Sequence, residues 1–371
     1  MKFTVEASAI SGALAVASKI VERRNTIPIL SNAFFDATAD RLLIRCTDLD
    51  LELSLTVPAK VSDAGQTTVP AHLLSDMMRK IPAGAEASFE IDQQMVVKAG
   101  RSNFKMHVLP AEDFPVMGGA DYSHTIEMSG EQLYKLFSSV QFAISTEETR
   151  YYLNGIFFHA RAGDRPTLRA VATDGHRLAK MEMPMPAEAD GMPAVIVPRK
   201  TVAEIVRLSQ TFADQKVILD VSDTKIRFTA GRNVIVSKLI DGTYPEYDRV
   251  IPAVGNKIAK VDAKTLAVAA DRVATISSER GRAVRFQVTA GDLTLSVINP
   301  DAGDAQDSID IDYDAEPLEI GFNSKYLLDA LNALPGKTAR ISLTDAGSPA
   351  RFTEDSDMDE TFLVVLMPMR I

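Results

Sequence analysis

Alternating apolar and polar positions recur along the chain and predict antiparallel β structure. In the segment 49–57, LDLELSLTV, leucine or valine occupies every odd position and Asp, Glu, Ser or Thr every even one. Alternation with period two places the two sets on opposite faces of a sheet. The segment 284–297, VRFQVTAGDLTLSV, alternates on both sides of Ala-Gly-Asp and therefore predicts a hairpin.

Six segments with apolar residues three and four positions apart predict amphipathic helices between these strands. Three of them directly follow a short strand. Each of these three is followed, after further strands, by one of the other three. The predicted helices span 7–24, 71–81, 130–145, 199–213, 263–276 and 324–337.

The same order of strands and helices recurs three times, which indicates an internal triplication. Aligning the first helices places Ile10, Leu133 and Leu266 in register, 123 and 133 residues apart. Aligning the second helices places Leu74, Val202 and Leu327 in register, 128 and 125 residues apart. A hairpin turn also recurs, as AGRSN at 99–103 and AGRNV at 230–234.

Each repeat predicts an α+β domain in which two helices pack on antiparallel sheets. Gly and Pro interrupt the pattern at 116–124 and at 251–257, which marks these stretches as joins. We therefore expect three structurally similar domains, with boundaries at 1–121, 122–251 and 252–371.

The placement of charge changes what the composition implies. A net charge of −10 argues by itself against a nucleic-acid partner. The six predicted helices, however, hold 13 Lys and Arg residues and six Asp and Glu residues, which leaves −17 for the rest of the chain. Helices gathered on one surface would form a positive face suited to sequence-neutral phosphate contact. Lysines on the solvent side of ordinary amphipathic helices are the alternative explanation.

Composition also bears on the compartment. The first residues, MKFTVEASAI, lack the apolar core of a signal peptide, and no apolar run approaches the roughly 18 residues of a membrane span. The single cysteine, Cys46, has no partner in the chain for a disulfide and suits a reducing compartment. We expect a cytoplasmic protein without a membrane partner, and Cys46 as a small residue in a strand.

The motif TDGHR at 173–177 has the residue types of a hydrolase, because Asp174 could orient His176. No nucleophile elbow of the form G-x-S-x-G accompanies it, and the five histidines lack metal-ligand spacing. The sequence therefore predicts no catalytic residue, no metal and no cofactor. The Asp-Gly pair between apolar strands predicts instead a hairpin turn with His176 and Arg177 at its rim.

Several motifs resemble one family. The motifs are RYYLNG (150–155), ATDGHRLA (172–179), VPRK (197–200), DGTYPEYDRVIP (241–252) and VLMPMRI (365–371). With them, the chain resembles the bacterial DNA sliding clamps, the β subunits of DNA polymerase III, from end to end. The resemblance implies a DNA clamp fold and a ring-shaped, head-to-tail homodimer around double-stranded DNA. It also implies a processivity subunit with no active site of its own, an accessory part of a nucleotidyltransferase assembly.

The resemblance further implies a pocket for short linear peptides. In the family such peptides are carried by the replicative polymerase, the clamp loader, repair polymerases, mismatch-repair proteins and ligase. Adaptable methionine side chains suit a pocket that accepts several related peptides. Pro349 stands where the family often has serine, which leaves the partner preference open. The matching residues are Tyr152, Leu153, Thr173, Gly175, His176, Arg177, Leu178, Pro245, Val250, Pro349, Val365, Met367, Pro368, Met369 and Arg370.

DNA contact in the family comes from basic residues on the helices and nearby loops. His72 replaces a family arginine here, and a neutral imidazole would bind phosphate more weakly. The positions that match are Arg24, Arg79, Tyr151, Arg199, Lys200 and Arg249.

For the dimer interface, the resemblance places Phe104 and Met106 of one subunit opposite Ile276 of the other. An apolar centre with charged flanks is common in obligate interfaces. The charged flanks would be Arg101 and Lys105 facing Asp301, Asp304 and Asp307.

Two other classes of function stay open at this point. One is a scaffold of three peptide-binding modules that never encloses DNA, and a monomeric mass would favour it. The other is a hydrolase that uses Asp174 and His176, for which replacement of His176 by alanine is the test.

Overall fold

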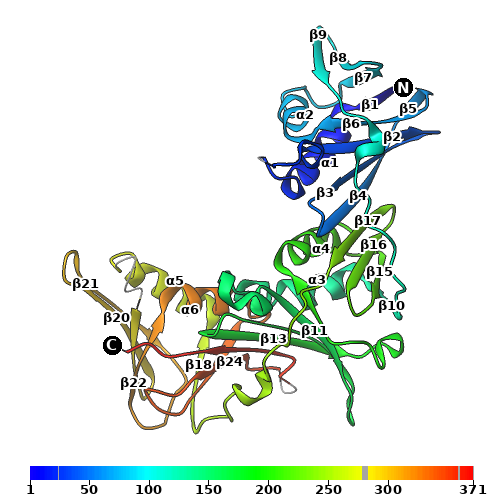
Figure 1. Ribbon diagram of the computed structural model, residues 1–371. Coiled ribbons are helices and arrows are strands. Elements are labelled where there is room, and N and C mark those ends of the chain that lie inside the picture. The colour runs from blue at the N-terminus through cyan, green and yellow to red at the C-terminus, as the bar shows by residue number, and fades with distance from the viewer. Residues whose placement is uncertain (24, 278–282, 358–359, 371) are drawn as a thin grey trace. The chain divides into compact units, whose positions relative to one another are not determined.

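The three repeats have the same order of elements in the computed structural model, which describes residues 1–23, 25–277, 283–357 and 360–370 (Figure 1). Each repeat opens with a strand and a helix, passes through further strands into a second helix, and ends with three strands. The side chains aligned from sequence are fully buried, which confirms the triplication and its register. They are Ile10, Leu133 and Leu266 in the first helices, and Leu74, Val202 and Leu327 in the second.

All six predicted helices form, but each ends earlier than predicted. Helix α1 stops because Val21 has an extended backbone, with φ −72° and ψ 127°. Helix α6 stops at Leu334, and the proline that follows disfavours a helical conformation of the residue before it. The helices of the described chain are α1 (Ala7–Ile20), α2 (Ala71–Met78), α3 (Gly130–Ser138), α4 (Arg199–Thr211), α5 (Ala263–Ala274) and α6 (Ser324–Ala333).

The shorter helices carry less positive charge than the sequence predicted. They hold eight basic and five acidic residues, a net charge of +3 instead of +7. The predicted ranges include five more basic residues, Arg23, Arg24, Arg79, Lys80 and Lys337, and one more acidic residue, Glu22. Of these, Arg23, Arg79, Lys80 and Lys337 lie just beyond the helix ends. Positive charge is therefore concentrated where the helices end as much as on the helices themselves.

Two compact units make up the chain, and their limits differ from those of the repeats. Unit 1 comprises Met1–Gly130 and Leu208–Leu239, and unit 2 comprises Glu131–Arg207 and Ile240–Ile371. The difference arises because strands of neighbouring repeats share a sheet. Strand β4 (Leu51–Pro58) pairs with β17 (Asn233–Lys238) in unit 1, and β13 (Arg177–Pro184) pairs with β25 (Phe362–Leu366) in unit 2.

The described residues of unit 1 form two antiparallel sheets, and α1 packs against α2, β3 and β4. The five-stranded sheet has the order β5 (Lys60–Asp63), β1 (Lys2–Glu6), β7 (Glu86–Ile91), β8 (Gln94–Ala99), β9 (Ser102–His107). The eight-stranded sheet has the order β10 (His124–Ser129), β15 (Lys216–Val221), β16 (Lys225–Ala230), β17 (Asn233–Lys238), β4 (Leu51–Pro58), β3 (Arg41–Thr47), β2 (Asn32–Thr38), β6 (Gly65–Pro70).

Unit 2 has the same plan where it is described, and α5 packs against α6, β20 and β21. Its eight-stranded sheet has the order β14 (Val195–Pro198), β11 (Gly155–Arg161), β12 (Thr167–Thr173), β13 (Arg177–Pro184), β25 (Phe362–Leu366), β24 (Ala350–Glu354), β23 (Thr338–Leu343), β18 (Lys257–Asp262). The four-stranded sheet has the order β21 (Gly303–Asp310), β20 (Asp292–Asn299), β19 (Ala283–Thr289), β22 (Leu318–Asn323).

Short 3-10 helices occupy several of the connections. They are η1 (Pro28–Ser31), η2 (Ala111–Asp113), η3 (Gln141–Ala143), η4 (Glu148–Leu153), η5 (Ala187–Ala189) and η6 (Tyr247–Arg249). Cys46 is buried in β3, as expected for a small strand residue. Among the described helices, none combines the length and apolarity that a bilayer crossing needs.

The predicted hairpins are present, and two details of strand β4 differ from prediction. The β19–β20 hairpin turns at Gly291, where φ is 77°, a left-handed conformation that favours glycine. In the 49–57 segment Leu49 precedes the strand, with φ 78°, and is exposed. Glu52, predicted on the polar face, is buried because its carboxylate accepts from Met117 N–H at 2.9 Å and lies 3.5 Å from Arg45 Nε.

Candidate functional site

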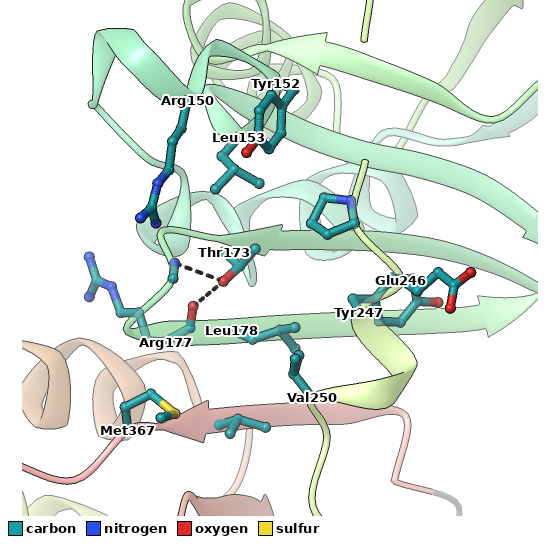
Figure 2. A pocket seen from close by; sticks show the side chains of 13 residues that line it. Arg150, Tyr152, Leu153, Thr173, Arg177, Leu178, Glu246, Tyr247, Val250 and Met367 are labelled. Carbon is teal, nitrogen blue, oxygen red and sulfur yellow. Dashed lines mark hydrogen bonds between the residues drawn. The ribbon is translucent and has the colours of Figure 1, made fainter. Parts of the chain in front are cut away.

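A mostly apolar cavity of about 350 Å³ opens in unit 2 beside the turn between β12 and β13 (Figure 2). Its other walls come from η4, from residues 245–250 and from the end of β25. A cavity of this size, with few polar groups, suits apolar side chains of a ligand. The lining residues are Arg150, Tyr152, Leu153, Thr173, Gly175, Arg177, Leu178, Pro245, Glu246, Tyr247, Val250, Val365 and Met367.

The TDGHR motif forms the turn that borders the cavity. Thr173 Oγ1 accepts from Gly175 N–H at 3.1 Å and donates to the Arg177 carbonyl at 2.6 Å (Figure 2). Asp174 Oδ1 accepts from the backbone N–H groups of His176 at 2.9 Å and Arg177 at 3.0 Å. Gly175 has φ 88°, which favours glycine. The Asp174 carboxylate therefore stabilises the backbone of the turn, so its role here is structural.

Arg177 fixes this turn from its other side. The guanidinium donates from Nε to Asp174 Oδ2 at 3.0 Å, from Nη1 to Asp329 Oδ2 at 2.6 Å and from Nη2 to the Phe142 carbonyl at 2.6 Å. Its Cζ atom also lies 4.3 Å from the centre of the Tyr326 ring, within range of a cation–π contact. The side chain is only 7 % exposed, so these bonds are shielded from water.

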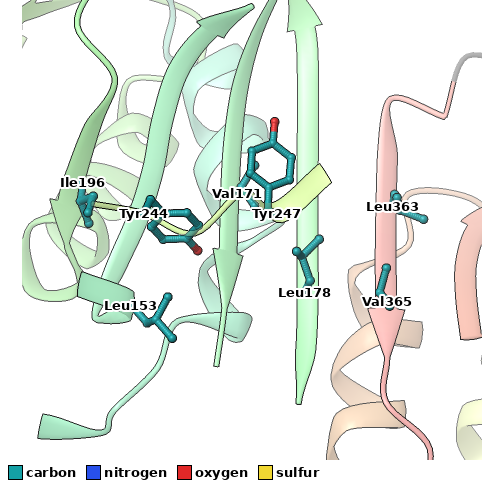
Figure 3. Packing of buried hydrophobic residues seen from close by; sticks show 8 residues of the cluster. All are labelled: Leu153, Val171, Leu178, Ile196, Tyr244, Tyr247, Leu363 and Val365. Carbon is teal, nitrogen blue, oxygen red and sulfur yellow. The ribbon is translucent and has the colours of Figure 1, made fainter. Parts of the chain in front are cut away.

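The cavity floor is continuous with the core of unit 2 (Figure 3). The Tyr244 ring stacks on Phe157 with centroids 4.7 Å apart. Burial raises the pKa of the Tyr244 hydroxyl, so it stays protonated at neutral pH. The floor of the cavity is therefore closely packed. The buried cluster beneath it comprises Leu153, Val171, Leu178, Ile196, Tyr244, Tyr247, Leu363 and Val365.

Most residues that the resemblance assigned to a pocket lie together here. Those that line the cavity are Tyr152, Leu153, Thr173, Gly175, Arg177, Leu178, Pro245, Val250, Val365 and Met367. Those that do not line it are His176, Pro349, Pro368, Met369 and Arg370.

The residues outside the cavity have other surroundings. The His176 ring lies 6.3 Å from that of Tyr326, and Met369 N–H donates to the Gly321 carbonyl at 2.8 Å. Pro349 follows a turn in which Asp345 Oδ1 accepts from Gly347 and Ser348 N–H groups at 2.8 Å.

Three lining residues were missed from sequence: Arg150, Glu246 and Tyr247. All three lie inside the motifs that carried the resemblance, at 150–155 and 241–252. The motifs give no sign of which side chains face the cavity, because these segments are irregular and have no fixed period.

The described residues that were expected to contact DNA lie on the surface or at the start of a helix, and two of the arginines form ion pairs within the chain. Arg79 pairs with Asp76 at 2.8 Å and Arg249 with Glu246, and each arginine remains largely exposed. Tyr151 is exposed, and Arg199 and Lys200 begin α4. Arg24 lies outside the described residues.

His72 has a role within unit 1 that the sequence did not indicate. Its Nε2 atom donates to the carbonyl of Val21 at 2.8 Å, which ties the start of α2 to the end of α1. A carbonyl can only accept, so Nε2 carries the proton. The His72 imidazole is therefore already bonded within the chain.

The residues expected at the dimer interface lie on or near two edge strands. Arg101 precedes β9, and Asp301 precedes β21; both are exposed, as are Lys105 and Asp304. Phe104 and Ile276 are half-buried, whereas Met106 is buried in its own unit.

Asp307 differs from expectation, because its carboxylate already accepts from Arg272 Nη1 in the same chain. Its predicted pairing with a second subunit would therefore compete with an existing ion pair.

Within residues 1–23, 25–277, 283–357 and 360–370, no group of three or more His, Cys, Asp or Glu side chains could hold a metal ion.

Comparison with known proteins gives one consistent result. Three family models of the DNA polymerase III beta subunit match the chain: the N-terminal domain over residues 1–118, the central domain over 127–246 and the C-terminal domain over 248–370. The beta sliding clamp of Caulobacter vibrioides is 47 % identical over 375 residues and that of Pseudomonas putida 38 % over 376, each with full coverage of both chains.

Solved structures agree with the sequence comparison. The sliding clamp of Bartonella birtlesii bound to griselimycin superimposes with a TM-score of 0.95 at 44 % identity, and that of Caulobacter crescentus with 0.91 at 47 %. Each comparison covers the whole of both chains. The chain therefore belongs to the family of DNA polymerase III β subunits, the bacterial β sliding clamps, which act as processivity factors in DNA replication.

Proposed function

We propose that two copies of this chain close head to tail into a ring around double-stranded DNA and tether the replicative polymerase to it. Membership of the sliding clamp family carries this proposal. We assign the three clamp domains to residues 1–121, 122–251 and 252–371. The protein would act without catalytic residues, metal or cofactor of its own, in the cytoplasm, where bacterial chromosomes are copied.

Two free sheet edges support ring closure. Strand β9 ends the five-stranded sheet of unit 1, and β21 ends the four-stranded sheet of unit 2. An edge strand presents unpaired backbone N–H and C=O groups that can pair with another chain. Two different edges joining head to tail form a closed ring when the rotation between subunits closes. Arg101 and Lys105, before and within β9, have a charge complementary to that of Asp301 and Asp304, before and within β21.

Weak and sequence-neutral DNA contact follows from the charge distribution. A net charge of −10 opposes bulk attraction to DNA, while the helices and the residues just beyond them are basic. We assign phosphate contact to Arg24, Arg79, Tyr151, Arg199, Lys200 and Arg249. Contacts of this type position a duplex without reading its sequence.

The cavity in unit 2 is the proposed docking site for partner peptides. Its walls are apolar, its turn is fixed by Asp174 and Arg177, and Met367 is 45 % exposed at its edge. We propose as partners the replicative polymerase, the clamp loader, repair polymerases, mismatch-repair proteins and ligase. The Bartonella birtlesii clamp binds griselimycin, and the Caulobacter crescentus clamp binds polyethylene glycol at its proposed β-motif tethering region. We expect this chain to bind griselimycin too.

Peptide binding is tested with a fluorescein-labelled synthetic peptide that covers the clamp-binding segment of the polymerase. Fluorescence polarisation should detect saturable binding that unlabelled griselimycin displaces. Met367→Ala should weaken the binding, whereas Met185→Ala, a half-buried methionine outside the cavity, should leave it unchanged. Wild-type affinity in Met367→Ala would refute the assignment of the cavity.

Ring formation is tested by the mass in solution. The closed dimer predicts a mass near twice 40.3 kDa, whereas the scaffold alternative predicts 40.3 kDa. Sedimentation velocity over a range of concentrations distinguishes the two.

A further inference from the structure

The segment 241–250 supplies Pro245, Glu246, Tyr247 and Val250 to the cavity wall. In the described chain its backbone bonds are local, from Arg249 N–H to the Glu246 carbonyl at 3.1 Å and from Val250 N–H to the Tyr247 carbonyl at 3.0 Å. No ladder of backbone bonds ties it to the neighbouring sheet within the described residues. The position of this wall must therefore depend on side chains.

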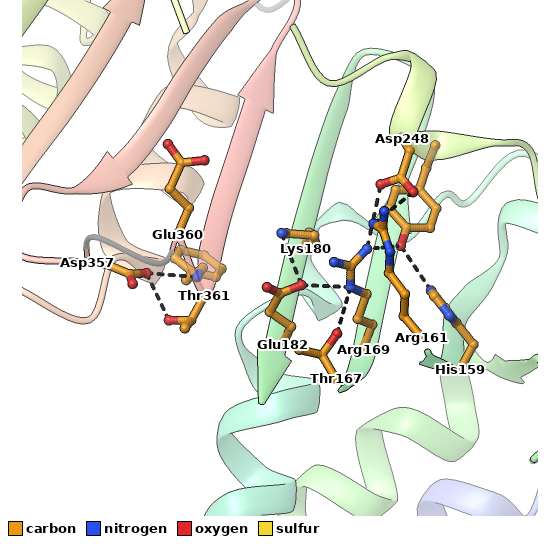
Figure 4. A network of polar contacts seen from close by, with 12 residues as sticks. His159, Arg161, Thr167, Arg169, Lys180, Glu182, Asp248, Asp357, Glu360 and Thr361 are labelled. Atoms are coloured by element: carbon orange, nitrogen blue, oxygen red, sulfur yellow. Dashed lines mark hydrogen bonds and ion pairs between the residues drawn. The ribbon is translucent and has the colours of Figure 1, made fainter. Parts of the chain in front are cut away.

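Two other side chains of this segment also contact strand β11: the Tyr244 ring stacks on Phe157, and Asp248 pairs with Arg161 at 3.2 Å. Tyr247 is the side chain that forms hydrogen bonds to both β11 and β12. Its ring packs edge-on against Phe157, with centroids 6.3 Å apart. Its hydroxyl lies 3.0 Å from His159 Nε2 and 3.1 Å from Arg169 Nη1 (Figure 4). One hydroxyl group thus connects the cavity wall to strands β11 and β12.

The chemistry of the partners fixes the direction of these bonds. A guanidinium can only donate, so the Tyr247 oxygen accepts from Arg169. His159 Nδ1 lies 3.1 Å from the Ala160 carbonyl, which can only accept, so Nδ1 carries a proton. In a neutral imidazole Nε2 is then the acceptor, and the Tyr247 hydroxyl donates to it. The chain of bonds runs from Arg169 through Tyr247 to His159 and depends on a neutral ring.

Arg169 is itself held in place. It is 9 % exposed, pairs with Glu182 Oε2 at 2.7 Å and donates to Thr167 Oγ1 at 3.1 Å. Glu182 in turn accepts from Lys180 at 3.2 Å. A buried arginine whose Nε and Nη1 groups are both bonded is a rigid donor, so it can define where the Tyr247 oxygen lies.

Charged groups from three elements surround the His159 ring. Arg161 lies on the same strand, Arg169 on β12, and Asp248 on η6 beside Tyr247. Burial is the largest effect and lowers the pKa of His159, and the two arginines lower it further. The Ala160 carbonyl and Asp248 act in the opposite direction. The ring is therefore neutral at pH 7 and gains a proton only in more acidic solution.

We propose that Arg169 and His159 are positioning residues for the docking cavity, which hold its 245–250 wall through the Tyr247 hydroxyl and release it when His159 is protonated. The proposal rests on the proposed function of the cavity as a peptide site. A protonated ring has no acceptor at Nε2, so the hydroxyl hydrogen loses its acceptor and two cationic donors face one oxygen. The wall then loses one of its ties to the sheet, while the Tyr244–Phe157 stacking and the Asp248–Arg161 ion pair remain.

The first test removes only the hydroxyl. Tyr247→Phe keeps the ring in the cavity wall, and the dissociation constant of the fluorescein-labelled polymerase peptide near pH 7.5 should rise about two- to tenfold, the range of one hydrogen bond. Tyr313→Phe is the matched control, because Tyr313 is buried and its hydroxyl donates to the Glu316 carbonyl outside the cavity. The control should bind like wild type.

The second test separates positioning from general stability by pH. With a peptide that lacks histidine, wild-type affinity should be constant from about pH 8 to 7 and weaken toward about pH 5. His159→Gln supplies an amide oxygen in place of Nε2 and does not titrate, so its affinity should stay near the neutral-pH value of wild type over the whole pH range. His159→Leu should be as weak as Tyr247→Phe, and the double variant no weaker than either single one.

The outcomes separate this proposal from the one on which it rests. No binding of the peptide by wild type would refute the docking function itself. Wild-type binding together with unchanged affinity in Tyr247→Phe would overturn the positioning role. An equal decline of affinity with acid in wild type and His159→Gln would overturn the part played by the proton.

Discussion

Arg177 Nη1 lies 2.6 Å from Asp329 Oδ2, and this ion pair joins the edge of the docking cavity to helix α6. Arg177 begins β13 in the second repeat, whereas Asp329 belongs to the third. The pairing of β13 with β25 links the same two repeats through the backbone. The cavity thus lies where two repeats are joined by both a sheet and a buried charge.

Replacing Arg177 should impair both stability and docking. In Arg177→Met the carboxylates of Asp174 and Asp329 and the Phe142 carbonyl lose their donor, which should cost about 2–4 kcal/mol of unfolding free energy. Peptide affinity should fall about tenfold or more, because the turn borders the cavity. Arg177→Lys keeps the charge but not the three donor directions, so its stability and its peptide affinity should lie between those of wild type and Arg177→Met. An unfolding free energy of Arg177→Met within about 0.5 kcal/mol of the wild-type value would contradict the role of Arg177 in holding the turn.

Removing residues 367–371 should reduce docking and spare the fold. Met367 lines the cavity, and its N–H donates to the His176 carbonyl at 2.9 Å at the end of the sheet. Because a terminal segment can be lost without opening a core, the melting temperature should change by no more than about 3 °C. Calorimetry should show peptide affinity lowered by about tenfold. Deletion of residues 370–371 alone keeps Met367 and should bind normally; equal binding by both truncations would count against the site.

The dimer should dissociate when a charge enters its apolar centre. Ile276→Asp would place an unpaired carboxylate in the proposed interface, close to residues 301–307, which are already acidic. Sedimentation velocity should show soluble monomers. Val254→Asp changes an exposed apolar residue outside the proposed interface and should remain dimeric. A dimer of Ile276→Asp that persists at nanomolar concentration would mean that the interface lies elsewhere.

His159 should make the fold more sensitive to acid. Its pKa is lowered in the folded chain, mainly by burial, so the unfolded chain binds a proton at higher pH than the folded one. This contribution to the unfolding free energy is fully present above the usual histidine range and is lost as the pH falls toward the lowered pKa. The unfolding free energy measured by urea titration should therefore change less between about pH 7.5 and about pH 5.5 for His159→Gln than for wild type. The same difference in both proteins would exclude this histidine as the cause.

The periodic parts of the fold could be predicted from sequence. Ile10, Leu133 and Leu266 recur because each helix buries the same face, and a fully buried position tolerates few residue types. Gly175 and Gly291 mark turns because their left-handed backbone favours glycine. Such features depend on neighbours close in sequence, which a pattern of a few residues records.

The remaining features depend on partners far apart in the chain. Glu52 looked like a solvent-facing strand residue, but the backbone of Met117 and the side chain of Arg45 bury it. His72 looked like a weakened phosphate contact, but it bonds to Val21. The role of Tyr247 depends on two strands some 80 residues earlier in the sequence. None of these pairings leaves a local signal.

Retention on circular DNA tests the central claim of a closed ring. Phosphate contacts weaken steeply with salt, so contacts alone would not keep an acidic protein on DNA in concentrated salt. The protein, loaded by a clamp loader with ATP onto nicked circular DNA, should remain bound through gel filtration at high salt. A single cut in the circle should release it from the ends, and neutralising Arg24 or Lys200 should alter loading more than retention. Equal retention on linear and circular DNA would contradict the ring.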